Sequence, residues 1–239
     1  HFRRVGGQEA NLGALISTYA SLEDGMAVDE EADSMAGQVV LITGSTAGLG
    51  LHAAKTYYKR GATVLLTCRD HIRGRNAVYE VQSCVERSKA DARKESAAGD
   101  SSHAPVDVGR IHLFELDLTD YRSMLQFAEE VKATVPAIDV LVCNAGVMGL
   151  PFELSGDGVE RHLHSNHLGH FMLINQLLPL LAASPSARVI VVTSGLYKRA
   201  TTLPSARQLM GEELWDYDAR TAYAVSKLAN CMYTIGLAK

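Results

Sequence analysis

The sequence lacks the features that mark several classes of protein. Its four cysteines, Cys68, Cys84, Cys143 and Cys231, are scattered and form no CxxC pair, which argues against a zinc ribbon or a disulfide framework and favours a reducing compartment. No apolar run approaches the roughly 18 residues that a membrane span needs, and the start of the chain shows no signal-peptide pattern. We therefore expect a cytoplasmic protein, or one at the cytosolic face of a membrane if an anchor precedes His1.

An excess of positive charge is also missing. The 239 residues carry a formal net charge of -4, so the chain has no basic field of the kind that attracts nucleic acid or anionic membranes. The hydrophobic share of 47% is that of a globular protein, and the length suits one domain. The expected partner is a small molecule, with no nucleic acid.

Beyond residue 36 the chain alternates short apolar segments with longer amphipathic ones, a pattern typical of repeated βαβ units. The apolar segments are nearly continuous, which predicts strands buried on both faces of a parallel sheet. Strands are predicted over Val39–Thr43, Thr63–Cys68, Ile111–Leu116, Asp139–Cys143 and Arg188–Thr193. Helices are predicted over 48–60, 71–88, 120–133, 157–183 and 221–238. The fold class is therefore α/β, with a doubly wound parallel sheet covered by helices on both faces.

Three stretches depart from this alternation. Residues 1–36 are rich in Gly, Ser and acidic residues and predict a flexible tail. Residues 88–109 are polar and predict an exposed, mobile insertion. The connection over 196–220 is long for a compact domain, and it leaves the carboxyl edge of the sheet, where ligands bind in open α/β folds.

The first predicted strand runs directly into a glycine-rich loop, and a helix follows at once. In such a loop one glycine allows a tight turn, one lets backbone amides approach a pyrophosphate, and one lets helix and strand pack closely. The N-terminus of the helix adds partial positive charge. Because a strand precedes it and a helix follows, we interpret the loop as dinucleotide-binding and not as an ordinary turn. Its candidate residues are Gly44, Ser45, Thr46, Gly48, Leu49 and Gly50.

The spacing of this loop, TGxxxGxG, resembles that of the short-chain dehydrogenase/reductase family, whose extended relatives show TGxxGxxG instead. The resemblance covers residues 37–239 and implies a Rossmann-type sheet and a nicotinamide cofactor. Two further matches follow in the order that the family shows. They are Asp117, with Leu118 after it, at the position that faces the adenine amino group, and the motif Asn144-Ala145-Gly146 after the fourth predicted strand.

The end of the second predicted strand favours NADP(H) over NAD(H). Members of the family that prefer NAD carry an acidic residue where Cys68 stands. That acid is absent, and Arg69 offers a guanidinium suited to a 2′-phosphate. The alternatives are that Arg69 is an ordinary surface residue or that Asp70 partly neutralises it, so NAD(H) stays open as the cofactor.

The last predicted helix contains a candidate catalytic pair, because Tyr223 and Lys227 match the motif YxxxK. Residues four apart lie on one face of a helix, so the lysine ammonium would favour the phenolate form of the tyrosine. A free tyrosine, with a pKa of about 10, is otherwise a poor proton donor or acceptor at neutral pH. The resemblance assigns both residues to cofactor binding as well.

The resemblance completes this site with two more side chains. Ser194 stands at the end of the fifth predicted strand, where the family's serine binds the substrate oxygen, and Thr193 is the alternative hydroxyl. Ser194 precedes Tyr223 by 29 positions, more than in compact relatives, which fits an enlarged substrate loop over 196–220. Asn166 matches the family's asparagine, which helps to hold a water chain leading from the lysine.

The string NHLGHF, together with YAVSKLAN, most resembles the retinol dehydrogenase and WW-domain oxidoreductase branch of the family. That branch implies a small lipophilic carbonyl or alcohol as substrate. Four histidines in this region raise the question of a metal site: His162, His164, His167 and His170. No further converging ligand is evident, and NHLGHF recurs in relatives that use no metal, so we predict none.

These features predict an NADP(H)-dependent oxidoreductase that moves a hydride between nicotinamide and a carbonyl or alcohol carbon. The resemblance implies two more strands and a substrate-binding segment after Lys239. We therefore expect an incomplete chain that ends inside the catalytic helix and leaves an apolar sheet edge unpaired. The alternative is a non-catalytic dinucleotide-binding regulator or an inactive fragment, and the intact set Asn166, Ser194, Tyr223 and Lys227 argues against it. Relatives also suggest a homodimer that pairs through the helices carrying Asn166 and Tyr223.

Overall fold

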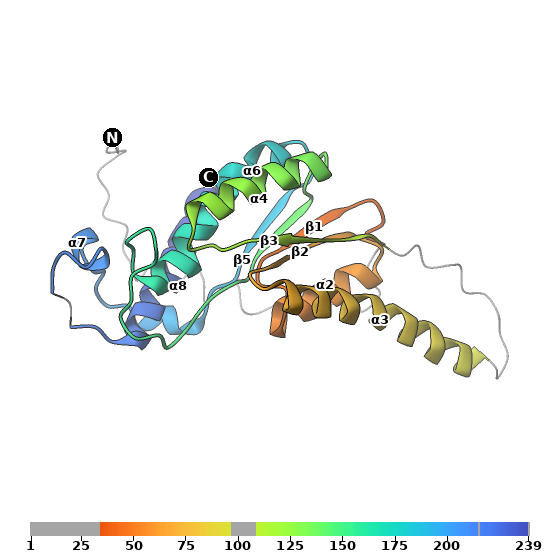
Figure 1. Ribbon diagram of the computed structural model, residues 1–239, viewed down its shortest axis with the longest axis horizontal. Coiled ribbons are helices and arrows are strands. Elements are labelled where there is room, and N and C mark those ends of the chain that lie inside the picture. Colours follow the sequence, from red (N-terminus) through yellow and green to blue (C-terminus); the bar gives the residue numbers. More distant parts are fainter. Residues whose placement is uncertain (1–33, 97–108, 215, 239) are drawn as a thin grey trace. The chain divides into compact units, whose positions relative to one another are not determined.

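A parallel sheet of five strands, in the order β3-β2-β1-β4-β5, forms the centre of the fold (Figure 1). The computed structural model describes residues 34–96, 109–214 and 216–238, with the backbone alone for 85–96. The strands are β1 (Val39–Ile42), β2 (Thr63–Cys68), β3 (Ile111–Glu115), β4 (Val140–Cys143) and β5 (Arg188–Val191). All five fall within the segments predicted from the sequence, and the predicted α/β class is confirmed.

Alternate residues of β1, β2 and β4 enter two separate hydrophobic cores, which is why these strands read as continuous apolar runs. Val40 and Ile42 of β1 pack with α2 (Gly48–Lys59) and α3 (His71–Ser96) on one face of the sheet. Leu41 enters the core on the other face, which α4 (Tyr121–Thr134) and α6 (Gly169–Ala182) cover. Figure 1 shows these two helix pairs on opposite sides of the sheet.

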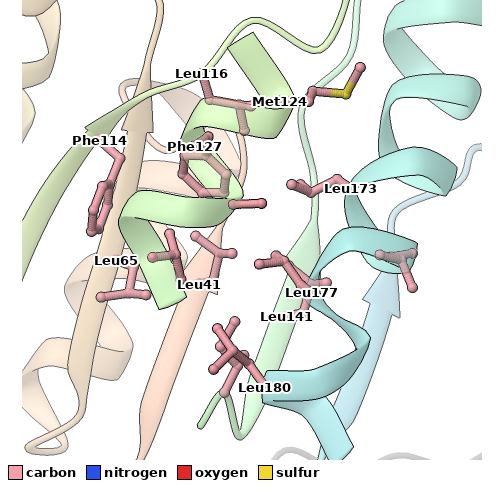
Figure 2. Packing of buried hydrophobic residues seen from close by; sticks show 14 of the residues in the cluster. Leu41, Leu65, Phe114, Leu116, Met124, Phe127, Leu141, Leu173, Leu177 and Leu180 are labelled. Atoms are coloured by element: carbon pink, nitrogen blue, oxygen red, sulfur yellow. The ribbon is translucent and has the colours of Figure 1, made fainter. Parts of the chain in front are cut away.

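Helix α4 shows how the sequence produces one of these layers. The carboxylate of Asp120 caps the helix by accepting hydrogen bonds from two amides of its first turn. Its buried side chains recur at helical spacing, and they are Met124, Phe127, Ala128 and Val131. Figure 2 shows Met124 and Phe127 above the strands, next to Leu173 and Leu177 of α6.

The strand order creates a crevice at one edge of the sheet. The chain winds outward from β1 to β3 and then crosses back to place β4 on the other side of β1. In open α/β sheets such a reversal leaves a ligand-binding crevice at the carboxyl ends of the two central strands. The glycine loop follows β1 and Asn144 follows β4, so both predicted motifs stand at this crevice.

The helix predicted over 71–88 continues as α3 to Ser96, into the first part of the predicted insertion over 88–109. Residues 88–96 are mostly Lys, Ala, Arg and Glu, which favour a helix even without an apolar face. Residues 97–108 lie outside the described part of the chain. So does most of the predicted tail over 1–36, of which 34–36 are described.

The helix predicted over 157–183 begins later, at Arg161, and consists of three consecutive helical segments. They are α5 (Arg161–Leu163), a π-helical turn η1 (His164–Leu168), and α6. The buried carboxylate of Glu160 accepts hydrogen bonds from the first amides of α5 and so fixes a later start.

The connection over 196–220 has structure of its own. It holds a 3-10 turn, η2 (Gly195–Arg199), and the short helix α7 (Ala206–Leu209), before α8 (Ala219–Leu237) begins. Strand β5 forms one edge of the described sheet, and Ile190 is exposed there. Within the described residues, no helix combines the length and the apolar character that crossing a membrane demands.

Candidate functional site

Three glycines of the loop after β1 stand where a side chain cannot easily be placed. Gly44 has a φ of +64°, and a Cβ there would lie 2.8 Å from the Cα of Ala145. Gly48 has a φ of +54°, a left-handed conformation that favours glycine. A Cβ at Gly50 would overlap the carbonyl oxygen of Gly44 and lie 2.6 Å from the side-chain nitrogen Nδ2 of Asn144. The loop therefore presents bare backbone.

Of the predicted residues that flank these glycines, Ser45 serves the fold. Ser45 is fully buried, and its Oγ accepts a hydrogen bond from the amide of Thr67 at 2.8 Å, which ties the loop to β2. Leu49 is 75% exposed. The N-cap residue of α2, Ala47, makes no side-chain hydrogen bond, so the first amides of α2 have no side-chain acceptor and can receive a phosphate.

A cleft of about 660 Å³ opens over this loop. The predicted cofactor residues that line it are Gly44, Thr46, Gly48, Arg69, Asp117, Leu118, Asn144, Ala145 and Gly146. Residues that sequence reasoning missed also line it, among them Thr43, Arg73, Val147 and Ser165. The structure does not place Ser45, Leu49, Gly50, Tyr223 or Lys227 in the cleft wall. The cleft is thus lined by predicted residues from segments that lie far apart in the sequence.

Two arginines stand at the end of this cleft where β2 leads into α3. They are Arg69, which was predicted, and Arg73, four residues later. The carboxylate of Asp70 does not need Arg69 as a partner, because it caps α3. Hydrogen bonds from the amides of Arg73, at 3.0 Å, and Ile72, at 2.7 Å, lower the pKa of Asp70. Its negative charge is directed to the helix backbone.

The loops after β1 and β4 are joined through the hydroxyl of Thr43. Its Oγ1 accepts hydrogen bonds from the amides of Asn144 and Ala145, both at 3.0 Å. The same oxygen lies 2.8 Å from Nε2 of His170, whose Nδ1 lies 3.1 Å from the carbonyl oxygen of Asn166. Since a carbonyl only accepts, Nδ1 carries the hydrogen and Nε2 accepts from Thr43. His170 is therefore neutral in this arrangement.

Asn166 lies in the π-helical turn η1, a local geometry that often marks functional sites. Its side chain holds both backbone groups of Val147: Oδ1 accepts from the amide at 2.7 Å, and Nδ2 donates to the carbonyl at 3.0 Å. Nδ2 also donates to Oγ of Ser226 at 2.9 Å. The predicted asparagine thus links the wall of the cleft to α8.

Tyr223 and Lys227 lie on one side of α8, as predicted. Lys227 Nζ is 5.7 Å from the ring centroid of Tyr223 and donates to the carbonyl oxygen of Val192 at 3.0 Å. The lysine is 4% exposed, and this burial lowers its pKa. A Cβ on Gly146 would lie 3.5 Å from Nζ and 3.1 Å from Oδ1 of Asn166. The cleft residue Gly146 therefore meets two of the predicted catalytic residues.

The two candidate hydroxyls after β5 differ in their surroundings. Thr193 Oγ1 donates to the carbonyl oxygen of Lys227 at 3.0 Å and lies 3.2 Å from Sγ of Cys231, so it is bound to α8. Ser194 is half-buried, and its Oγ accepts from the amide of Leu196 at 3.3 Å, at the start of η2. Ser194 keeps its hydroxyl hydrogen available, which favours it over Thr193.

The four histidines of this region are held by neighbouring protein groups. His164 Nδ1 lies 2.7 Å from Oγ of Ser155, and His167 Nδ1 lies 3.1 Å from Oδ1 of Asn230. Among the residues that the structure describes, no group of three or more His, Cys, Asp or Glu is placed to hold a metal ion.

The family model for short chain dehydrogenases matches residues 38–104 and 90–204. The chain therefore belongs to the short-chain dehydrogenase family, whose members bind a nicotinamide cofactor. The resemblance predicted from the glycine loop and YxxxK is confirmed.

Curated proteins of the predicted branch are similar to this chain. Retinol dehydrogenase 14 of Homo sapiens is 36% identical over 205 residues, which are 86% of this chain and 57% of that protein. The WW domain-containing oxidoreductase of Gallus gallus is 32% identical over 204 residues, 84% of this chain and 44% of that protein. The chain thus spans about half the length of these relatives.

A solved structure of an uncharacterized protein from Mycobacterium Paratuberculosis is also similar. It shares 33% sequence identity with a TM-score of 0.65, and the match covers 87% of this chain and 63% of that one. The likeness extends the family assignment from sequence to three-dimensional structure.

The buried neutral His170 predicts that the fold loses stability in mild acid. Burial lowers its pKa to about 4, whereas an unfolded histidine titrates near 6.5. As pH falls from about 6.5 to 4 the unfolded chain takes up a proton that the folded chain refuses, so the free energy of unfolding decreases, by about 3 kcal/mol from this group. Urea unfolding of the wild type and of His170→Gln at pH 7.5 and pH 4.5 measures this contribution. The variant should lose less stability than the wild type on acidification, and equal losses would contradict the assignment.

Proposed function

We propose that this chain is the cofactor-binding and catalytic part of an NADP(H)-dependent oxidoreductase that interconverts a carbonyl and an alcohol. The observation that carries the proposal is the meeting, at Gly146, of the dinucleotide-type cleft with Asn166 and the buried Lys227. Beside this cleft, Tyr223, which lies one helical turn from Lys227, can exchange a proton with a substrate oxygen.

The residues present fit a nicotinamide dinucleotide. Gly44 and Gly50 have no room for a side chain, so the loop keeps its backbone bare, and the N-terminus of α2 has no side-chain cap. The pyrophosphate would lie against these amides. Asp117 would face the adenine, and Asn144, Ala145 and Gly146 would border the nicotinamide ribose.

When bound, the cofactor supplies or accepts the hydride. The chain's own residues handle the substrate oxygen: Ser194 donates a hydrogen bond that polarises it, and Tyr223 gives up its phenolic proton to it in the reductive direction. Oxidation of an alcohol reverses both roles. The positive charge of Lys227 near the ring stabilises the phenolate that Tyr223 becomes. Asn166 holds the wall of the cleft against these residues.

The preference for NADP(H) rests on the positive end of the cleft. Arg69 and Arg73 both line it, and Cys68 stands where an acid would repel a 2′-phosphate. Asp70 directs its carboxylate to the amides of α3. The guanidinium of Arg69 is therefore the proposed partner of the 2′-phosphate.

A lipophilic substrate is favoured by the loops beyond β4 and β5. Exposed apolar side chains gather on these loops: Met148, Phe152, Leu154, Leu203, Met210 and Leu214. Leu154 meets Gly211, where a Cβ would lie 3.1 Å from the leucine, so the two loops touch. The curated relatives named as retinol dehydrogenases point the same way. Pairing with a second copy of the chain and a cytoplasmic location both stay predictions.

Replacing Tyr223 with phenylalanine tests the proposed proton donor. We expect kcat for reduction of medium-chain aldehydes with NADPH to fall by about 100- to 10,000-fold, because the proton must then come from water. Tyr79→Phe makes the same chemical change at a side chain that is 71% exposed, and it should leave kcat unchanged. Turnover of Tyr223→Phe at the wild-type rate would remove Tyr223 from this role and leave a non-catalytic dinucleotide-binding function.

Replacing Arg69 with alanine tests the cofactor preference. The dissociation constant for NADPH should rise about 10- to 100-fold, as expected for loss of a hydrogen bond to a charged group, while that for NADH changes little. Arg188→Ala removes an exposed arginine at the amino end of β5, the edge of the sheet away from the cleft, and serves as the control in fluorescence titrations. A parallel loss of affinity for both cofactors would contradict the proposed 2′-phosphate contact.

A further inference from the structure

The buried residues Glu160 and His162 form a cluster with the half-buried Tyr217 beside the candidate site, and this cluster has no role in the chemistry proposed above. Glu160 and His162 are 1% and 0% exposed. Tyr217 comes from the connection before α8 and places its hydroxyl 3.2 Å from Oε1 of Glu160 and 3.0 Å from Nδ1 of His162. The cluster thus joins two segments that are 55 positions apart.

The backbone donors around the cluster fix which nitrogen of His162 carries the hydrogen. The amide of Leu150 donates to Nε2 of His162 at 3.2 Å, so Nε2 carries no hydrogen. Nδ1 therefore carries it and donates to Oε1 of Glu160 at 2.7 Å, while Oε2 accepts from the amide of Leu163 at 2.7 Å. The hydroxyl of Tyr217 donates to the carbonyl oxygen of Leu150 at 2.9 Å, and Oε1 of Glu160 is its second acceptor at 3.2 Å. Burial and the charge of Glu160 raise the pKa of Tyr217, which keeps this hydroxyl protonated.

These contacts bind the backbone of Leu150 in the same way that Asn166 binds the backbone of Val147. Asn166 binds the amide and the carbonyl of Val147, and the cluster binds the amide and the carbonyl of Leu150. We call residues 147–150 the strap. Both backbone groups are thus held at each end of the strap, which directly follows the cleft residue Gly146 and contributes Val147 to the cleft wall. Met148, between the two ends, is 53% exposed.

The cluster also contacts the candidate catalytic tyrosine. The ring of His162 packs edge-on against the ring of Tyr223, with centroids 6.4 Å apart and planes at 78°. It lies tilted against the ring of Tyr217 at 6.5 Å. His162 therefore lies between Tyr217, which binds the carbonyl of Leu150 in the strap, and Tyr223, the proposed proton donor.

We propose that Glu160, His162 and Tyr217 are positioning residues that fix the strap and the ring of Tyr223 in the arrangement needed for turnover. None of them touches the reacting atoms. A buried carboxylate and imidazole rarely add more stability than apolar residues of the same size, and their best-attested use is to enforce one arrangement. The role in turnover rests on the proposed function, whereas the hold on the strap does not.

The test uses Tyr217→Phe in the full 239-residue chain, with Tyr79→Phe as the matched control. Three quantities are measured: hydrogen exchange of the peptide covering 147–150, the dissociation constant for NADPH, and kcat and KM with a medium-chain aldehyde. We expect exchange of the strap to become roughly three- to tenfold faster and kcat to fall by a similar factor, since one hydrogen bond is lost. The affinity for NADPH should stay within about twofold, because the loop over Gly44 to Gly50 is untouched.

A second pair of variants guards against a purely structural effect. His162→Leu removes the donor and the acceptor, and His162→Gln keeps one of each. We expect His162→Gln to recover part of the kcat that His162→Leu loses, while KM for NADPH stays constant in both. If His162→Leu does not fold, the result from Tyr217→Phe decides alone.

Unchanged strap exchange and unchanged kcat in Tyr217→Phe would overturn the proposal, and so would an equal loss in Tyr79→Phe. A wild-type chain that turns over no carbonyl would contradict the proposed function instead. In that case the exchange measurement, which needs no substrate, still decides whether the cluster holds the strap.

Discussion

The ends of β1 and β4 approach so closely that backbone meets backbone, and the rest of the site depends on this approach. Gly44 has no room for a side chain beside Ala145. The side-chain nitrogen Nδ2 of Asn144 donates to the carbonyl oxygens of Thr43 and Gly44, at 3.0 and 3.2 Å. The loops therefore hold each other with little help from long side chains. Their amides stay fixed at the cleft, and such oriented dipoles suit the proposed binding of a phosphate without rearrangement.

Buried polar contacts continue from this junction to α8. His170 joins Thr43 to the carbonyl of Asn166, and the side chain of Asn166 joins Val147 to Ser226. Within the described residues, no buried side-chain nitrogen or oxygen lacks a hydrogen-bond partner. A fully satisfied network in a region of low dielectric strongly favours one arrangement over others. The tyrosine and lysine of α8 are thereby kept near the cleft although the glycine loop lies far from them in sequence.

Local signals explain what could be predicted from the sequence. Continuous apolar runs predicted all five strands. In the loop after β1, glycine stands at each position that has a positive φ or no room for a side chain. The rest depends on distant contacts or on propensity. Ser45 turns inward because Thr67 of another strand binds it, and residues 88–96 form a helix through propensity without an apolar stripe. His162 and Tyr217 lie 55 positions apart in the sequence, and no motif near either residue predicts their contact.

The central claim is that one cleft presents a dinucleotide to the tyrosine and lysine of α8. A crystal structure of the chain with NADPH bound measures this most directly. We predict the pyrophosphate at the N-terminus of α2, the 2′-phosphate within hydrogen-bonding distance of Arg69, and the nicotinamide ring beside Tyr223. A cofactor bound away from the cleft, or with its nicotinamide far from Tyr223, would contradict it.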